Sequence, residues 1–365
     1  MNADPSRQTP AEWEESAQLL PAPNRDLPAG RHQFHKERLM ARIQQDENNR
    51  TTAAAQRRPG ARRFTMPRRL IAVPVIAGAL AGAVAIGASL LGPGGDGAGV
   101  AGGPVLTTPV GQATTKGVPQ LLDRISLAAA EGSGPDAKAG QYVYIESKTA
   151  NSYEKTVDGR SSLASDKLHV RRMWKSLDGT KGWLIDPAVN NSPEGETLSL
   201  PDENGDTPVA SLNGPSYNYL AELTTDPDKL LRKIYKETEG QGNTPDQEAF
   251  TTIGDLLGES YPPAGLYSAL FKAAAKIPGV VVVQDAVDAA GRHGVAVARL
   301  DETSGERMEW IFDKKTHVFL GERSVQVRGD GGTDGVVKRG TVTFTSAIMQ
   351  RAVVDDIKQM PGEAG

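Results

Sequence analysis

The sequence predicts an α+β domain that follows a single membrane span. Three observations lead to this prediction. Residues 70–91 carry no charge, helix start signals gather between residues 226 and 263, and from residue 280 the apolar pattern changes to a period of two. Helices grouped among antiparallel strands are typical of α+β proteins. The 365 residues suffice for one large or two small domains.

Residues 1–69 are predicted to be a basic, mostly disordered cytoplasmic region, with 13 Lys/Arg against 8 Asp/Glu. A short helix over residues 31–45 is the exception. Its apolar face would consist of Phe34, Leu39, Met40 and Ile43. A free helix of this length is marginal in water, so we interpret the face as a candidate docking element for a cytoplasmic partner. A frayed linker helix is the alternative.

The uncharged segment Leu70–Leu91 has 22 residues. As a helix it would be about 33 Å long, enough to cross a hydrocarbon core of about 30 Å. Many basic residues precede it, and the first charge after it is Asp96. The positive-inside rule therefore predicts a single-pass signal anchor with a cytoplasmic N-terminus and an extracytoplasmic C-terminal region in the cell membrane. A buried globular helix is the alternative.

Two features flank or lie within the predicted span. The basic residues next to it are Arg57, Arg58, Arg62, Arg63, Arg68 and Arg69. Their position favours membrane lipids with anionic headgroups as partners over nucleic acid. Gly78 and Gly82 form a GxxxG pair that allows two helices to approach closely, although plain Ala/Gly composition also explains the pair.

Residues 92–117 are rich in Gly, Pro and Thr and are predicted to be a flexible linker to an extracytoplasmic domain, residues 118–365. That domain is expected to begin with a helix over Val118–Glu131. The strands expected next are Gln141–Ala150, Glu154–Val157, Leu168–Leu177 and Gly182–Ile185. The polar stretch Asn190–Gly214 reads as a long loop.

Three helices are then predicted from their start signals. Asp226 and Thr244 each stand as a cap residue before a proline, and Pro262-Pro263 begins the third helix. Short turns separate the apolar segments that follow, which is typical of an antiparallel meander. The strands expected there are Val280–Val283, Gly294–Leu300, Arg307–Phe312, His317–Arg328 and Val336–Thr345.

No pattern in the sequence predicts catalytic, cofactor-binding or metal-ligating residues. The chain has no Cys and only five His, and it lacks HExxH, GxSxG and P-loop motifs. Asp202, Asn204 and Asp206 have the 1-3-5 spacing of a calcium loop, but Thr207 and Asn213 stand where that loop needs Gly and Glu. We therefore predict a non-catalytic protein without a cofactor.

Several long blocks resemble an uncharacterised actinobacterial family of single-pass membrane proteins. They are Asp26–Ile43, Ser216–Glu237, Asp246–Ser260, Ala273–Arg299 and Glu309–Arg323. Members of that family are often encoded beside extracytoplasmic-function sigma factors, so the resemblance implies a regulatory or sensor role. It implies no catalytic residues.

The pattern of the extracytoplasmic domain also resembles the half-barrel fold of lipoprotein carriers and of periplasmic sensors that regulate anti-sigma factors. In that fold, helices pack against the concave face of an antiparallel sheet. A likeness of fold implies little about function by itself.

Three hypotheses follow for the function. The first is a bitopic membrane protein that links an extracytoplasmic sensor domain to sigma-factor-related regulation in the cytoplasm. The second is a membrane-anchored binding module for a lipid or other apolar ligand. Its candidate lining, which ordinary core packing would also explain, is Tyr142, Tyr144, Trp174, Trp183 and Trp310. The third is a cell-envelope enzyme of unknown class.

Overall fold

The structure is a computed structural model that describes residues 101–132, 134–157, 160–190, 192–198, 209–331 and 335–362. The predicted cytoplasmic region, the predicted span and residues 92–100 of the predicted linker lie outside these ranges. None of the helices in the described part of the chain is long and apolar enough to span a bilayer.

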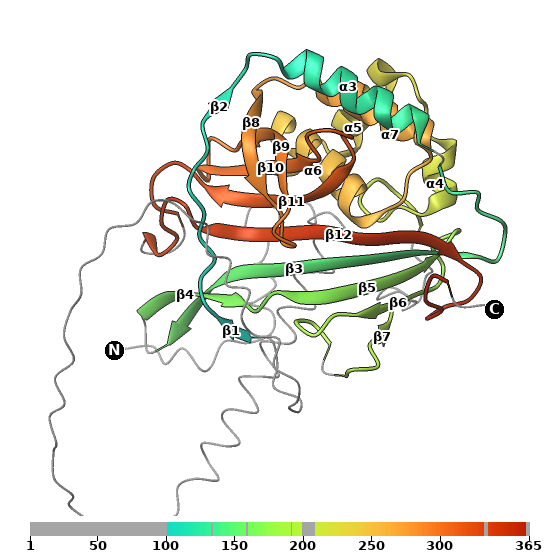
Figure 1. The fold of residues 1–365 in the computed structure, drawn as a ribbon, viewed down its shortest axis with the longest axis horizontal. Coiled ribbons are helices and arrows are strands. Elements are labelled where there is room, and N and C mark those ends of the chain that lie inside the picture. The colour runs from blue at the N-terminus through green and yellow to red at the C-terminus, as the bar shows by residue number, and fades with distance from the viewer. Residues whose placement is uncertain are drawn as a thin grey trace, which may run out of the picture.

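The α+β prediction is confirmed, because the described residues form one large antiparallel sheet with a few helices (Figure 1). The strand order is β2-β8-β9-β10-β11-β12-β3-β5-β6-β7, and β4 pairs with β3 and β1. The strands are β1 (Ala101–Gly103), β2 (Ala113–Thr114), β3 (Tyr142–Val157), β4 (Arg160–Asp166), β5 (His169–Ser176), β6 (Gly182–Ile185), β7 (Glu196–Thr197), β8 (Val280–Val287), β9 (His293–Leu300), β10 (Glu306–Phe312), β11 (Phe319–Gln326) and β12 (Val342–Val354).

The helices of the described ranges are α3 (Val118–Glu131), α4 (Tyr217–Glu222), α5 (Pro227–Glu237), α6 (Pro245–Glu259) and α7 (Ala264–Ala274). The predicted helix Val118–Glu131 and the three helices with start signals are confirmed. The Asp226 side chain accepts hydrogen bonds from the backbone N–H groups of Asp228 and Lys229, and Thr244 accepts one from Gln247. These caps satisfy N–H groups that have no partner inside the helix.

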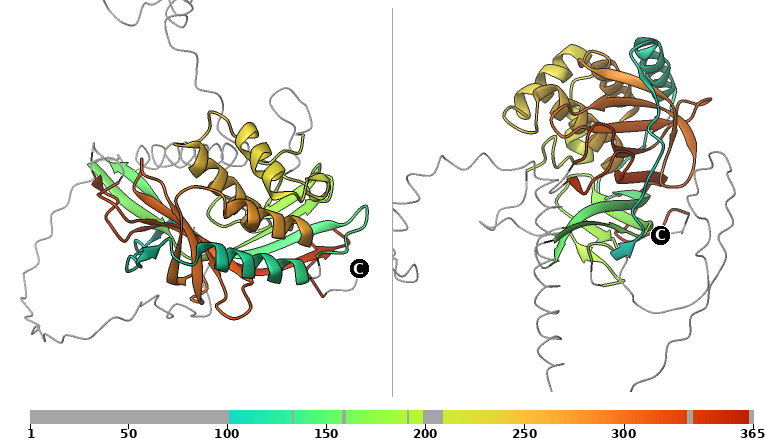
Figure 2. Two further views of the ribbon diagram at one scale, coloured as in Figure 1. Left: turned by 90° about the horizontal axis from the view of Figure 1, so that it is seen from above. Right: turned by 90° about the vertical axis from the view of Figure 1, so that its left-hand side faces the viewer.

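The main core lies between the helices and one face of the sheet. Helices α5, α6 and α7 lie on this face, which curves around them when the molecule is seen from above (Figure 2). Strand residues such as Val282, Val297 and Trp310 are fully or almost fully buried against the helices. Trp310 stacks on Phe250 of α6 with the ring centroids 3.8 Å apart. We call this side of the sheet the helix face.

The chain between β1 and β2 crosses the opposite face of the sheet (Figure 1). The Thr108 N–H donates to the Gly340 carbonyl, and the Thr108 hydroxyl accepts a hydrogen bond from Arg323. Residues 101–117 were expected to be linker, yet they include two short strands that pair with β4 and β8. This segment covers a buried ion-pair cluster in which Glu309 binds both Arg307 and Arg323.

Candidate functional site

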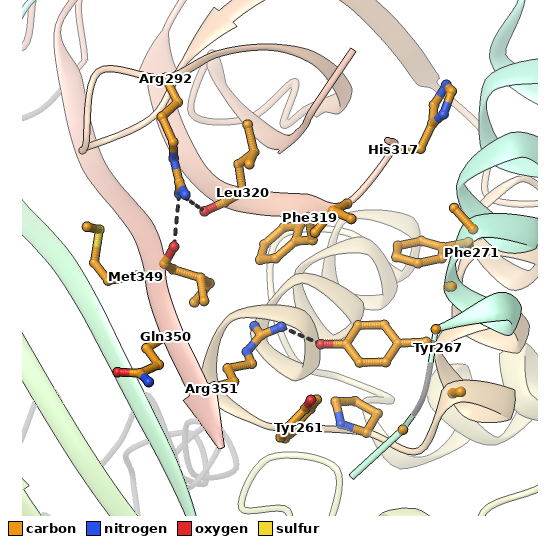
Figure 3. A pocket seen from close by; sticks show the side chains of 18 residues that line it. Tyr261, Tyr267, Phe271, Arg292, His317, Phe319, Leu320, Met349, Gln350 and Arg351 are labelled. Carbon is orange, nitrogen blue, oxygen red and sulfur yellow. Dashed lines mark hydrogen bonds between the residues drawn. The ribbon is translucent and has the colours of Figure 1, made fainter. Parts of the chain in front are cut away.

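A cleft of about 420 Å³ opens between α3, α7 and the adjoining parts of β11 and β12 (Figure 3). One wall consists of small residues: Ala128, Ala129, Gly132, Gly134 and Ala264. Most of them come from the last turn of α3 and the residues after it. Because none of these side chains is long enough to reach the sheet, the space between α3 and the strands stays open.

The opposite wall is aromatic and aliphatic. Tyr267 and Phe271 come from α7, Phe319 comes from the start of β11, and Ile348 comes from β12. Phe271 and Phe319 also contact Phe312 of β10 edge-on, with centroid distances of 5.5 and 5.6 Å. This wall therefore continues the main core up to the surface, and the cleft is mostly apolar.

Two β-bulges lie beside the cleft and decide which side chains enter it. In the pairing of β10 with β11, Ile311 faces Gly321 and Phe312 faces Phe319, so Leu320 is an extra residue. An extra residue reverses the alternation of side chains along a strand. Phe319 therefore lies on the helix face together with Phe312.

The second bulge is in β12. Its pairing with β3 places Ile348 opposite Ser147 and Gln350 opposite Glu146, so Met349 is the extra residue. Beyond the bulge, Arg351 pairs with Ile145, which packs on the helix face. The bulge thus directs the Arg351 side chain toward the helices instead of toward the opposite face.

Arg292 holds the two bulges in place. Its Nη2 donates to the Leu320 carbonyl at 2.8 Å and to the Ile348 carbonyl at 2.9 Å (Figure 3). The charge of Arg292 is balanced by the fully buried carboxylate of Asp288, 2.7 Å away. Arg292 is therefore a structural residue that fixes one side of the cleft.

Arg351 lines the cleft and has no carboxylate partner among the described residues. Its Nη1 donates to the Tyr267 hydroxyl at 2.5 Å (Figure 3). Its Nη2 donates to the Leu257 carbonyl at the end of α6. The guanidinium carbon lies 5.7 Å from the centroid of the Phe319 ring, within the range of a cation–π contact. The Nε atom is buried and has no hydrogen-bond partner among the described residues.

The charged residues of the described cleft lining are both arginines, Arg292 and Arg351, and this lining includes no Asp or Glu. Burial raises the pKa of the Tyr267 hydroxyl, and the nearby Arg351 opposes this shift only in part. Tyr267 is therefore a neutral phenol near pH 7 and can donate its proton in a hydrogen bond.

A second recess of about 450 Å³ adjoins the first, and His317 lines both. It lies under the N-terminal half of α3. Its cationic lining residues are Lys116, Arg124 and Lys314, of which Lys314 pairs with Asp285 at 2.8 Å. The described linings of the two recesses therefore contain cationic side chains and no carboxylate.

The site residues predicted from the sequence lie outside the described residues. They are the docking residues Phe34, Leu39, Met40 and Ile43, the basic residues Arg57, Arg58, Arg62, Arg63, Arg68 and Arg69, and the glycine pair Gly78 and Gly82. The acidic loop at Asp202, Asn204 and Asp206 also lies outside. Within the described ranges, no group of three or more His, Asp or Glu side chains could hold a metal ion.

None of the five aromatic residues considered as ligand lining faces the cleft. Trp310 belongs to the main core, and Tyr144 and Trp174 pack on each other at 5.0 Å on the opposite face of the sheet. Trp183 lies under Lys358. The alternative interpretation, ordinary packing, therefore holds for Trp310, Tyr144 and Trp174.

The residues that do form the cleft were not identified from the sequence. The run of small residues at 128–134 was the available signal for one wall. The Arg351–Tyr267 contact joins residues 84 positions apart, and no local pattern marks it.

No protein-family model matches the chain, and no curated protein sequence matches it either. The family resemblance described above therefore remains a prediction.

Proposed function

We propose that the domain is a binding module for an apolar ligand and that the cleft between α3, α7, β11 and β12 is its site. The single observation that carries this proposal is the open apolar cleft, with small residues on one wall and aromatic residues on the other. Its volume of about 420 Å³ falls in the range of small-molecule sites, roughly 300–1,000 Å³. Each methylene group that leaves water there gains about 0.8 kcal/mol.

The edge of the cleft supports the same function. Val318 and Met349 line the cleft and are 58% and 48% exposed. Leu127, which directly precedes the lining residues of α3, is 62% exposed. Contiguous exposed apolar surface is typical of binding sites. Val318 and Met349 extend the apolar lining of the cleft to its exposed edge.

We further propose that the module is anchored by Leu70–Leu91 outside the cytoplasm and acts as the sensor part of a bitopic protein. The support is the charge asymmetry around that segment and the family resemblance. In this mechanism, ligand occupancy changes the orientation or pairing of the span, and residues 31–45 become exposed or hidden toward a sigma factor or another regulator. If residues 1–69, used as bait in an affinity capture, bound no regulator specifically, this part of the proposal would be contradicted.

Binding of the fluorescent probe N-phenyl-1-naphthylamine tests the site. The full chain should be kept in an amphipathic polymer, because detergent monomers would compete for the cleft. Ala128→Phe places a ring in the cleft, and Val209→Phe is the matched control at a site that is 90% exposed and does not line the cleft.

We expect one probe per chain for the unmodified protein and for Val209→Phe. The Ala128→Phe variant should bind about tenfold more weakly or worse, since the ring occupies the ligand's volume. Equal binding by both variants would show that the probe binds elsewhere and would reject the cleft as the site.

A further inference from the structure

The charge of Arg351 has no counter-ion within the described part of the chain. Of its five N–H donors, two have acceptors, namely the Tyr267 hydroxyl and the Leu257 carbonyl. Both acceptors are neutral, and the face of Phe319 is its one other partner among the described residues. Arg351 is half-buried, and charged groups that are partly removed from water are commonly paired with an opposite charge. Arg292, also half-buried in the same cleft, has such a partner in Asp288.

The surroundings of Arg351 fit an anion. Its Nε is buried and has no acceptor among the described residues, so the hydrogen-bonding capacity of the guanidinium is not filled by the protein. The Tyr267 oxygen accepts from Arg351, while its own O–H has no acceptor among the described residues. A guanidinium and a phenol side by side can both donate to one carboxylate or phosphate.

Two further features favour a negative ligand. The described lining of the cleft has no carboxylate that would repel an anion. The adjoining recess contributes Lys116 and Arg124, neither of which forms an ion pair with another described residue. These charges raise the local positive potential and would attract an anionic headgroup.

From this geometry we infer that the cleft binds an amphiphile with one acyl chain and an anionic head, a carboxylate or a phosphate. The head pairs with Arg351 and accepts from Tyr267, and the chain lies against Phe271, Phe319 and Ile348. This inference rests on the proposed function and names its ligand class.

Arg351 also has a structural role, because it binds the last turn of α6 through the Leu257 carbonyl. The test must therefore distinguish a loss of folding stability from a change in the preference for anionic over neutral ligands. Arg351→Met removes the charge and keeps an apolar chain of similar length, and Tyr267→Phe removes one donor while the charge stays. A structural role alone would weaken all ligands equally, whereas an anion site changes the ratio between anionic and neutral ligands.

The experiment is competition against N-phenyl-1-naphthylamine with the full chain in an amphipathic polymer. The competitors are palmitate, palmitoyl lysophosphatidate and the neutral monopalmitoylglycerol. For the unmodified protein we expect at least one anionic competitor to bind about tenfold more tightly than the neutral one, the size of one charge-assisted contact. Preference for palmitate or for lysophosphatidate identifies a carboxylate or a phosphate head.

In Arg351→Met the ratio of anionic to neutral affinity should fall to about one, with the neutral affinity unchanged. In Tyr267→Phe the ratio should fall by a smaller factor, and this variant decides the matter if Arg351→Met does not fold. A ratio near one in the unmodified protein, or an unchanged ratio in the folded variants, would overturn the anionic inference and leave the proposed function standing. Failure of the probe and of all three competitors to bind would overturn both.

Discussion

Replacing Glu309 with alanine should destabilise the domain more than replacing either of the arginines that it binds. The Glu309 side chain is fully buried on the face of the sheet opposite the helices. Its Oε1 accepts from Arg307 Nε at 2.8 Å, and its Oε2 accepts from Arg323 Nε at 2.8 Å. The side chains of both arginines are also buried, 6% and 4% exposed.

The magnitude follows from the charges that remain. Glu309→Ala leaves two buried guanidinium groups without a carboxylate, and breaking a buried ion pair in this way costs about 3–5 kcal/mol. Arg307→Met instead leaves a neutral pair, Glu309 with Arg323, and fills most of the vacated volume. We expect that substitution to cost about 1–2 kcal/mol, an ordinary value for a point mutation.

Urea unfolding of the full chain, followed by tryptophan fluorescence, measures the difference. For a slope of about 3 kcal/mol per molar urea, a loss of 4 kcal/mol lowers the midpoint by more than about 1 M. Arg307→Met should lower it by roughly half of that or less. If the two variants had equal midpoints, or if Arg307→Met were the less stable one, the argument from unbalanced buried charge would be wrong.

Three further predictions concern other parts of the fold. Burial opposes the charged form of His169, but its hydrogen bonds to Asp186 and to the Lys167 carbonyl, together with the charges of Asp186 and Asp166, outweigh burial and raise the pKa of the imidazole above 6.5. A raised folded-state pKa stabilises the fold below about pH 6.5, and this contribution disappears as the pH rises through the folded value. The free energy of unfolding should therefore fall over that interval more steeply than in His169→Gln, and parallel pH profiles of the two proteins would contradict this. Asp226→Ala removes the cap of α5 and should cost about 1 kcal/mol in urea unfolding, with no loss if the two backbone bonds are unimportant. In Gly254→Ala the added Cβ would lie 2.5 Å from Nε1 of the buried Trp310, so thermal unfolding should show a loss of about 1–3 kcal/mol from overpacking. An unchanged melting temperature would mean that α6 shifts freely.

The helices were predictable because their signals are local. Asp226 and Thr244 cap helices that start at the following proline, as their sequence context indicated. Helix α4 was missed, since six residues carry too little of a periodic pattern. Capping and proline act within one turn of the chain, so neither depends on the rest of the fold.

Strand bounds depend on distant partners and were predicted less well. The sequence indicated two strands, Gln141–Ala150 and Glu154–Val157, where β3 is one strand of 16 residues. The polar interruption lies where β3 changes its partners. Residues up to Thr149 pair with β5 on one edge, and residues up to Asn151 pair with β12 on the other. Residues from Ser152 pair with β4, a strand that was not predicted.

The last strand shows the same effect. The sequence indicated Val336–Thr345, whereas β12 is Val342–Val354. Its second half, from Ser346 to Val354, follows the long pairing with β3. Intrinsic β-propensity is a weak guide where a cross-strand partner decides the length of a strand.

The cleft could not be predicted from strict two-residue alternation along the strands. Phe319 and Arg351, which meet there, are each separated from the rest of their strand by an extra residue that reverses the alternation. Along β12, Phe344, Ser346 and Ile348 lie on the helix face, and strict alternation would place Gln350 there next. The extra residue Met349 places Arg351 there instead. Along β11, the alternation counted back from Glu322 would likewise direct Phe319 away from the helices, but Leu320 reverses it. The cation–π contact between Arg351 and Phe319 thus needs two bulges at once, and Arg292 binds a backbone carbonyl at each of them. Bulges often redirect side chains at functional sites. This pair of bulges brings to an apolar cleft a guanidinium that has no counter-ion in the described part of the chain, which favours ligand binding there over simple packing.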